Sequence, residues 1–244
     1  MILLDCGNSN LKAQLRIDGQ VRASYSCSYK AGWTQRLSRW MKDLPVTHCY
    51  LASVLDQTRH TSLEQCLRPK FETAVTRFVS LPQALGVRNG YQQPEQLGVD
   101  RWLALIAAAE IVNGDALVID AGSAITLDLL RADGQHLGGA ILPGFNTSPD
   151  DFKRIFSHID FDDAAIAETA EPGCSTEAAI HINYRHSLID GLTGLVDRWI
   201  SYLDNDATLL LTGGDAARVQ RRLERHGRIV PDLVFRGMAR LGGQ

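Results

Sequence analysis

Two short stretches, ILLDCGNS at residues 2–9 and LVIDAGSA at residues 117–124, decide the fold that this sequence predicts. Each is an apolar run that ends in Asp, followed by one further residue, a Gly and a small polar residue. A second run of alternating apolar residues follows each copy, over residues 11–15 and 126–130. The pattern predicts the same β-hairpin used twice in one chain.

The remainder of the first half has the pattern of an α/β fold. Helical spacing of apolar residues predicts helices over residues 33–41 and 62–71, and a strongly apolar helix over residues 101–112. Residues 49–54 have the pattern of a strand. With the hairpin, the first half reads as three strands, a helix, a strand and a helix.

The two hairpin copies open the two halves of the chain. Their placement predicts two similarly built lobes, residues 1–112 and 113–244, with a ligand cleft between them. The chain has 244 residues, of which 45% are hydrophobic, so it is long enough for two small cores.

Charge and cysteine usage exclude several classes of protein. A net charge of -3 gives no general attraction to nucleic acid or to an anionic membrane. The five cysteines are scattered and never spaced as CxxC, which argues against a disulfide framework and a structural zinc site. No run reaches the roughly 20 apolar residues of a membrane span, and residues 1–5 do not resemble a signal peptide. We expect a cytoplasmic protein with no nucleic-acid or membrane partner.

Each repeated turn has the chemistry to hold phosphate. Asp5 and Asp120 sit where a strand ends, and the glycine after each lets backbone approach a ligand closely. Asp5 suits Mg²⁺ delivered with ATP, because that hard cation takes carboxylate oxygens. Lys12 could add positive charge beside the phosphates. The alternative is a pair of plain hairpins with a solvated lysine. Possible hydrogen-bond donors to phosphate oxygens are Asn8, Ser9, Ser123 and Thr126.

A third glycine turn follows the apolar run at residues 208–212. Gly213 and Gly214 leave no side chain in the way of a flat ring, so adenine or ribose could lie on this turn. A tight connection from strand to helix explains the same residues equally well. The sequence contains neither GxxxxGK[ST] nor GxGxxG, so it supports neither a P-loop nor a Rossmann nucleotide site.

Asp100 and Arg101 stand at the start of the apolar helix of the first half. An acid in the first turn of a helix is stabilised by the helix dipole, and it can be no more than a helix-start residue. In a kinase, Asp100 could instead accept the proton of an attacking hydroxyl, and Arg101 could bind a substrate carboxylate.

Six motifs, in this order, resemble those of the type III pantothenate kinases over essentially the whole chain. They are DCGNSN at 5–10, YQQPEQLGVDRW at 91–102, DAGSAIT at 120–126, GGAILPG at 138–144, GCSTEAAI at 173–180 and TGGDA at 212–216. The resemblance implies two duplicated lobes of the actin and ribonuclease H type, each a mixed sheet flanked by helices. It also implies ATP-dependent phosphorylation of pantothenate to 4′-phosphopantothenate by a homodimer, the first step of coenzyme A synthesis.

The resemblance also assigns roles residue by residue. It implies that Asp100 is the general base and that Asp120 holds a monovalent cation, K⁺ or NH₄⁺. Ser123 stands where the family more often has Thr, which keeps the hydroxyl. The implied ATP-binding residues are Asp5, Cys6, Gly7, Asn8, Ser9, Asn10, Leu11, Lys12 and Ser123. The implied pantothenate-binding residues are Tyr91, Gly98, Val99, Asp100, Arg101 and Thr176.

Two alternatives to this function stay open at the level of sequence. One is a nucleotide-binding regulatory protein with weak or no turnover, against which Asp100, Arg101 and Thr176 argue. The other is a related small-metabolite kinase of the same superfamily, distinguished by its acceptor. We expect the basic run 218–228 to be a solvated helix face, and residues 150–171 to form a surface helix and connector. A long helix from residue 175 toward residue 199 is expected to carry part of a twofold interface.

Overall fold

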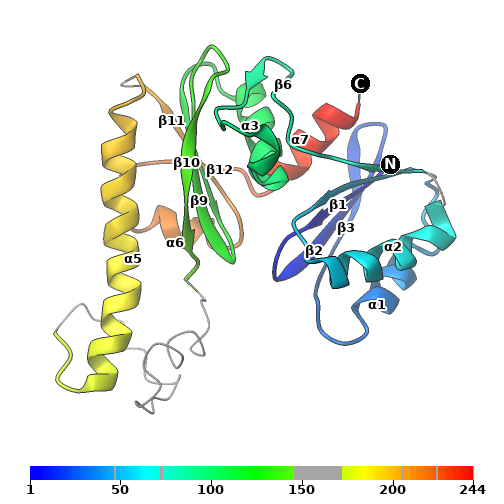
Figure 1. Cartoon of the computed structure of the whole chain (residues 1–244), viewed down its shortest axis with the longest axis horizontal. Helices are drawn as coiled ribbons and strands as arrows, with labels where there is room; N and C mark the ends of the chain where they lie inside the picture. Colours follow the sequence, from blue (N-terminus) through cyan, green and yellow to red (C-terminus); the bar gives the residue numbers. More distant parts are fainter. Residues whose placement is uncertain (47, 72–73, 146–171, 205, 224, 244) are drawn as a thin grey trace. The chain divides into compact units, whose positions relative to one another are not determined.

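The computed structural model describes residues 1–46, 48–71, 74–145, 172–204, 206–223 and 225–243. Within these residues the chain forms two five-stranded sheets and one short two-stranded hairpin, with helices between the strands (Figure 1). The predicted α/β class with two sheets flanked by helices is confirmed.

The first sheet has the order β3-β2-β1-β4-β5. Its strands are β1 (Ile2–Cys6), β2 (Asn10–Ile17), β3 (Gln20–Ser28), β4 (Cys49–Ser53) and β5 (Val75–Arg77). β1 pairs antiparallel with β2 and parallel with β4. The helices α1 (Trp33–Met41) and α2 (Gln57–Phe71) contribute Leu37 and Leu63 to a core that includes Leu4 and Leu11. The predicted hairpin, strand and two helices of this region are confirmed.

The second sheet has the order β10-β9-β8-β11-β12. Its strands are β8 (Ala116–Ala121), β9 (Ala124–Leu130), β10 (His136–Pro143), β11 (Thr208–Thr212) and β12 (Arg228–Ile229). The helix α5 (Thr176–Ile200) packs Leu188, Leu192 and Val196 into the core of this sheet, and α6 (Ala216–Gln220) follows β11. In chain order both sheets place their strands as third, second, first, fourth and fifth. The repeated hairpin therefore belongs to a repeated sheet.

One further helix follows each of the two sheets in the chain. α3 (Val99–Ile111) comes after β6 (Gln83–Ala84), β7 (Val87–Arg88) and the 3-10 turn η1 (Pro94–Gln96), and α7 (Leu233–Gly242) comes after β12. α3 and α7 pack together so closely that a Cβ built on Gly237 would lie 1.9 Å from the carbonyl oxygen of Leu103. Glycine at position 237 is what allows this approach.

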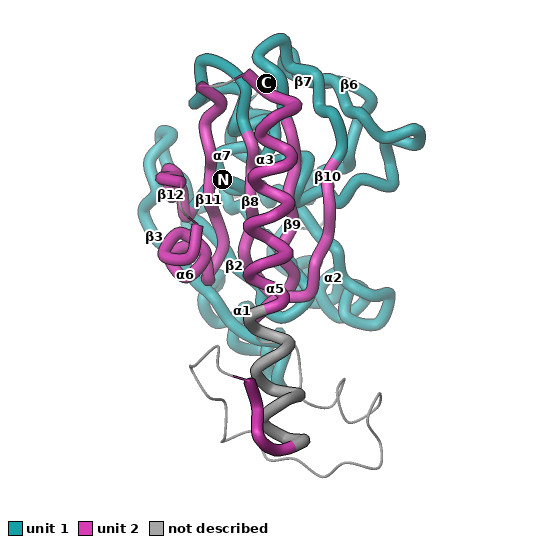
Figure 2. The backbone as a smooth tube through the Cα atoms, turned by 90° about the vertical axis from the view of Figure 1, so that its left-hand side faces the viewer, with its two compact units in different colours: residues 1–116, 130–138, 232–244 teal, residues 117–129, 139–231 magenta. Residues whose placement is uncertain are grey.

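The chain forms two compact units that interleave along the sequence (Figure 2). One unit comprises residues 1–116, 130–138 and 232–244, and the other comprises residues 117–129 and 139–231. The last segment joins the first unit because α7 packs on α3. The loop after β9 joins it because Arg88 forms an ion pair of 2.9 Å with Asp133. The lobe limits of 1–112 and 113–244, which follow the sequence repeat, remain a prediction.

The expectation of one helical face over residues 218–228 is wrong. α6 ends at Gln220, and β12 begins at Arg228. The Gln220 side chain closes the turn between them, since its Oε1 accepts from the N–H of Gly227 at 2.8 Å and its Nε2 donates to the Arg225 carbonyl at 2.9 Å. The expected connector at residues 150–171 lies outside the described residues. No helix in the described part of the chain is long and apolar enough to cross a membrane.

Candidate active site

The first repeated turn places an acid and a base side by side. Asp5 on β1 is paired with Lys12 on β2 in the antiparallel register, and directly paired residues project from the same face of a sheet. Residues 7–9 form the turn between the two strands, with Asn8 and Ser9 exposed. The turn can therefore present a carboxylate, an ammonium group and hydrogen-bond donors to one ligand.

Cys6 projects from the opposite face of β1, into the core shared with α1 and α2. Burial, followed by the charge of Asp5, raises the pKa of the Cys6 thiol well above its ordinary value. Tyr29 lies close enough that Cys6 and Asp5 also raise its phenol pKa, after the larger effect of burial. Cys6 is thus a neutral packing residue behind the turn, and it can contact ATP only through its backbone.

The sequence reading missed Arg59, which touches the same turn. Arg59, in the first turn of α2, donates from Nη1 to the carbonyl oxygen of Asn8 at 2.9 Å. The two residues are 51 positions apart, so no local spacing predicts the contact. The one sequence signal is the position of Asp56 just before α2, where acids commonly cap a helix.

The second repeated turn is enclosed by backbone from two other loops of its own unit. A Cβ built on Gly213 would lie 2.3 Å from the Ala121 carbonyl oxygen and 2.4 Å from Oδ1 of Asp120. A Cβ built on Gly144 would lie 2.5 Å from the carbonyl oxygens of both Gly122 and Ser123. Three glycine turns of the sequence, at residues 122, 144 and 213, therefore meet at one place.

Two oxygens of the second repeated turn approach one position beside Gly213. The Asp120 carboxylate and the Ala121 carbonyl both approach the position beside Gly213, and carboxylate and carbonyl oxygens are the donors that hard cations prefer. Among the described residues no group of three or more His, Cys, Asp or Glu side chains is placed to hold a metal ion. Any cation held here would depend on backbone oxygens and on bound ligands.

Asp100 lies in the first turn of α3, as the sequence predicts. Its Oδ1 accepts from the N–H of Arg101 at 2.8 Å, and a Cβ built on Gly98 would lie 2.6 Å from the same oxygen. Glycine at position 98 thus leaves room for the carboxylate, while the helix begins with the Trp102 N–H bonded to the Gly98 carbonyl at 3.0 Å. The start of α3 fixes the position of this acid.

Arg101 and Tyr91 form one polar cluster beside Asp100. Arg101 is only 5% exposed; its Nη1 donates to the Tyr91 hydroxyl at 2.7 Å, and its guanidinium lies 5.5 Å from the ring centroid of Tyr91. The Tyr91 ring stacks on His136, which is fully buried and whose Nδ1 accepts from the Gly90 N–H at 3.3 Å. Sequence reasoning missed His136, since it lies 45 residues beyond Tyr91 in the chain.

The structure thus brings together part of each predicted set of site residues. Asp5 and Lys12 lie together in one unit, Tyr91 lies with Arg101 in that unit, and Asp120 lies beside the Ser123 turn in the other. Thr176 is the first residue of α5, and its side chain lies outside what the structure describes.

Comparison with known proteins identifies the family. Residues 1–201 match the family model described as type III pantothenate kinase. The chain belongs to the type III pantothenate kinase family. It is 36% identical over 245 residues to the type III pantothenate kinase of Pseudomonas fluorescens, with 98% of each chain covered. It is 34% identical to that of Nitrosococcus oceani, covering 99% of this chain and 93% of the relative.

Solved structures confirm the fold of this pantothenate kinase family member. A conserved Baf family protein from Campylobacter jejuni aligns with a TM-score of 0.58 and 23% identity, covering 100% of this chain and 99% of that one. The activator of 2-hydroxyisocaproyl-CoA dehydratase from Clostridium difficile, solved with bound ADPNP, aligns with a TM-score of 0.54 and 13% identity, covering 99% and 92%. At these identities the likeness concerns the fold alone, which is the actin-like type that the sequence predicts.

Proposed function

We propose that this chain transfers the γ-phosphoryl group of ATP to the hydroxyl of pantothenate, giving 4′-phosphopantothenate and ADP for coenzyme A synthesis. The observation that carries the proposal is the family match over residues 1–201, a stretch that contains every residue assigned to the site. Phosphoryl transfer needs mainly positioning and charge stabilisation, so one base and well-placed phosphate contacts are sufficient protein chemistry.

Asp100 serves as the general base in this proposal. Its carboxylate accepts the proton of the pantothenate hydroxyl as that oxygen attacks phosphorus. The hydrogen bond from the Arg101 N–H to Oδ1 supports the assignment, because it orients the carboxylate. The rigid start of α3 further limits how far this group can move.

Arg101 and Tyr91 bind pantothenate through its carboxylate. Arg101 is 5% exposed, so its guanidinium has little contact with water, and its attraction to an anion is stronger for that reason. Tyr91 supports the role by fixing one nitrogen of the guanidinium at 2.7 Å, which orients the planar fork. Gly98, Val99 and Thr176 complete the proposed substrate contacts.

The two repeated turns bind ATP and its cations. Residues 5–12 and Ser123 contact the nucleotide, and Asp5 takes Mg²⁺ or its water shell, so that this cation neutralises charge on the phosphates. Asp120 holds K⁺ or NH₄⁺, an assignment supported by the Ala121 carbonyl oxygen, which approaches the same position as the Asp120 carboxylate. A homodimer in solution belongs to the same proposal.

The deciding experiment measures ADP release by the purified protein with Mg-ATP and KCl, with and without pantothenate. We expect release that depends on pantothenate, and loss of at least about a hundredfold in kcat for Asp100→Asn with ATP binding retained, as for removal of a general base. Activity of Asp100→Asn near the wild-type level would refute the base assignment.

Two other outcomes point to the alternatives. ATP binding without ADP release would favour a regulatory nucleotide-binding protein. Release with another small hydroxyl compound in place of pantothenate would favour a related kinase of the superfamily.

A further inference from the structure

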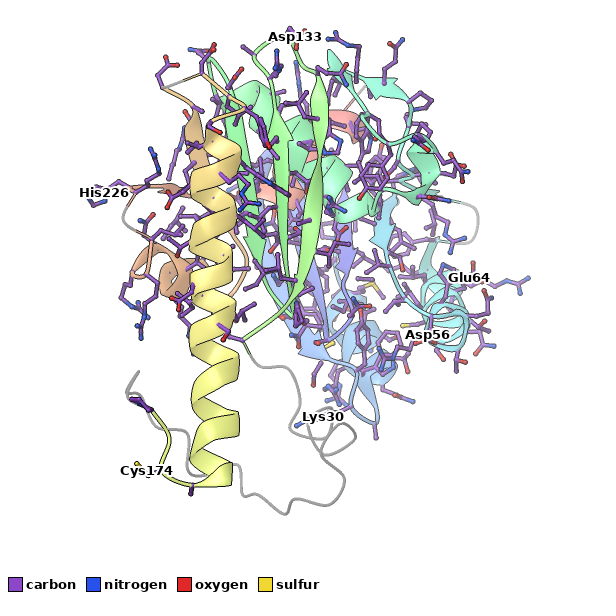
Figure 3. The ribbon with its side chains drawn as sticks, turned by 60° about the vertical axis from the view of Figure 1, so that its left-hand side comes forward. Lys30, Asp56, Glu64, Asp133, Cys174 and His226 are labelled. Carbon is purple, nitrogen blue, oxygen red and sulfur yellow. The ribbon has the colours of Figure 1, made fainter. Side chains whose placement is uncertain are left out.

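Asp56 and Arg59 form a side-chain bridge from the start of α2 to the first repeated turn. Asp56, labelled in Figure 3, precedes α2 and accepts the Arg59 N–H at its Oδ1 at 3.0 Å, the geometry of an N-cap residue. Its other oxygen lies 3.5 Å from Nε of Arg59. The cap of the helix therefore also anchors the guanidinium, which donates to the Asn8 carbonyl at 2.9 Å.

The ring of Tyr29 completes this anchor. The Arg59 guanidinium carbon lies 5.0 Å from the centroid of the Tyr29 ring, a cation–π distance. Tyr29 packs in turn edge-on against Trp33, the first residue of α1, at 5.1 Å between ring centroids. Three contacts, to a carboxylate, a ring and a carbonyl, hold one arginine whose side chain is 44% exposed.

Arg59 approaches the turn from the side opposite to the proposed phosphate contacts. Asp5 and Lys12 project from one face of the first sheet, whereas Cys6 projects from the other, into the core where Tyr29 packs. The guanidinium therefore lies on the core side of the sheet and donates a hydrogen bond to the backbone of the turn. This geometry suits a residue that fixes the turn rather than one that touches the nucleotide.

The corresponding place in the second sheet is supported by close glycine packing where the first sheet uses Arg59. There the connection after β11 reaches the second turn through backbone, with the Asp215 N–H donating to the Ala121 carbonyl at 2.9 Å and Gly213 packed against the same residue. After β4 the Val54 N–H likewise donates to the Cys6 carbonyl, at 3.1 Å, but this connection has no glycine, and Arg59 adds a side-chain contact to the Asn8 carbonyl. Both turns are thus supported from the connection that follows the fourth strand of their sheet.

We propose that Arg59 is a positioning residue for ATP binding. Its hydrogen bond to the Asn8 carbonyl fixes the turn at residues 7–9, and Asp56 and Tyr29 fix the Arg59 side chain. The inference rests on the proposed binding of ATP by this turn. Without this hydrogen bond the turn samples more conformations. Binding of ATP must then order the turn, and this lowers the affinity for ATP. The pantothenate contacts at Tyr91 and Arg101 do not depend on it.

The test is calorimetric titration of the full-length protein with Mg-ATP, in the absence of pantothenate. We expect Arg59→Ala to raise Kd for Mg-ATP about tenfold, the effect of losing one charge-assisted hydrogen bond. Arg59→Lys should recover part of this loss, since Lys can donate one hydrogen bond but lacks the planar fork that meets both Asp56 and Asn8. In turnover, KM for ATP should rise while KM for pantothenate stays within about twofold of wild type.

Arg68→Ala is the matched control, because Arg68 is an exposed arginine near the other end of the same helix. It removes the same charge from α2 and should leave Kd for Mg-ATP unchanged. An Arg59→Ala protein with wild-type ATP affinity, or an equal loss in Arg68→Ala, would overturn the inference. A wild-type protein that binds ATP without phosphorylating pantothenate would instead overturn the proposed function, and the titration would still test Arg59.

Discussion

The two repeated turns share a sequence pattern but are supported differently. The turn after β1 receives a backbone hydrogen bond from Val54 to Cys6 and a side-chain contact from Arg59, which Asp56 holds. The turn after β8 is held by backbone packing against Gly144 and Gly213, where even a methyl group has no room. An Asp-x-Gly pattern thus specifies the turn and the acid, whereas the surrounding chain decides how rigidly both are kept.

The largest effect is expected from breaking the backbone support with Gly213→Ala. Gly213 has φ +89°, and its added Cβ would lie 2.3 Å from a carbonyl oxygen that cannot rotate away. The strained backbone and the overlap together should lower the free energy of unfolding by about 2 to 5 kcal/mol. The measurement is chemical denaturation followed by circular dichroism. Gly214→Ala is the control, since nothing lies within 4 Å of its Cβ position, and equal stability losses in both variants would contradict this account.

A second prediction separates the acids of the two turns. Asp5→Asn removes the charge proposed to face Mg-ATP, so kcat/KM for ATP should fall about 10- to 100-fold at saturating pantothenate.

Asp120→Asn should act through the monovalent cation instead. Wild-type and Asp5→Asn enzymes should lose rate when Na⁺ replaces K⁺, and Asp120→Asn should show no such difference. A wild-type rate that is unchanged in Na⁺ would remove the cation role from Asp120.

The smallest effect is expected from making the first turn more like the second with Cys6→Ala. Position 6 corresponds to Ala121, and loss of one buried sulfur should cost about 1 kcal/mol of stability with little change in activity. The thiol pKa is raised in the folded protein, so the stability from keeping the thiol neutral is present below its ordinary value of 9.0 and is lost as the pH rises above it.

Thermal melts of both proteins between pH 7 and pH 11 provide the measurement. The wild-type melting temperature should fall more steeply above pH 9.0 than that of Cys6→Ala. Cys49, whose pKa burial raises to about 12, remains in both proteins and keeps part of the alkaline decline. Parallel curves for the two proteins would mean that Cys6 does not contribute.

Local patterns were enough to predict most elements of the first sheet. The Asp-x-Gly hairpins, the strand at β4 and the apolar helix at α3 follow from alternation and helical spacing, which depend only on neighbouring residues. β10 was not predicted, because Gly138 and Gly139 interrupt its strand pattern. Residues 218–228 do not form the single helix expected. Their intermittent apolar pattern is also compatible with a short helix followed by a turn that Gln220 closes.

The candidate site was predictable in its acids and less so in its supports. Asp5, Asp100 and Asp120 stand beside glycines at the ends of predicted elements, and that placement is visible in sequence. The contacts of Arg59 with Asn8, of Tyr91 with His136 and of Gly213 with Ala121 join residues far apart in the chain. Only the packed fold brings such partners together, so no spacing rule indicates them.

The packing of α7 on α3 has a consequence for the order of events during synthesis. Residues 117–129 and 139–231 form one unit, whereas the other unit also needs residues 232–244 to be complete. The unit that carries Asp100 closes only after residues 233–242 have emerged, because α3 lacks its neighbour until then. The helix that positions the proposed base therefore reaches its final surroundings only after a segment far along the chain has been made.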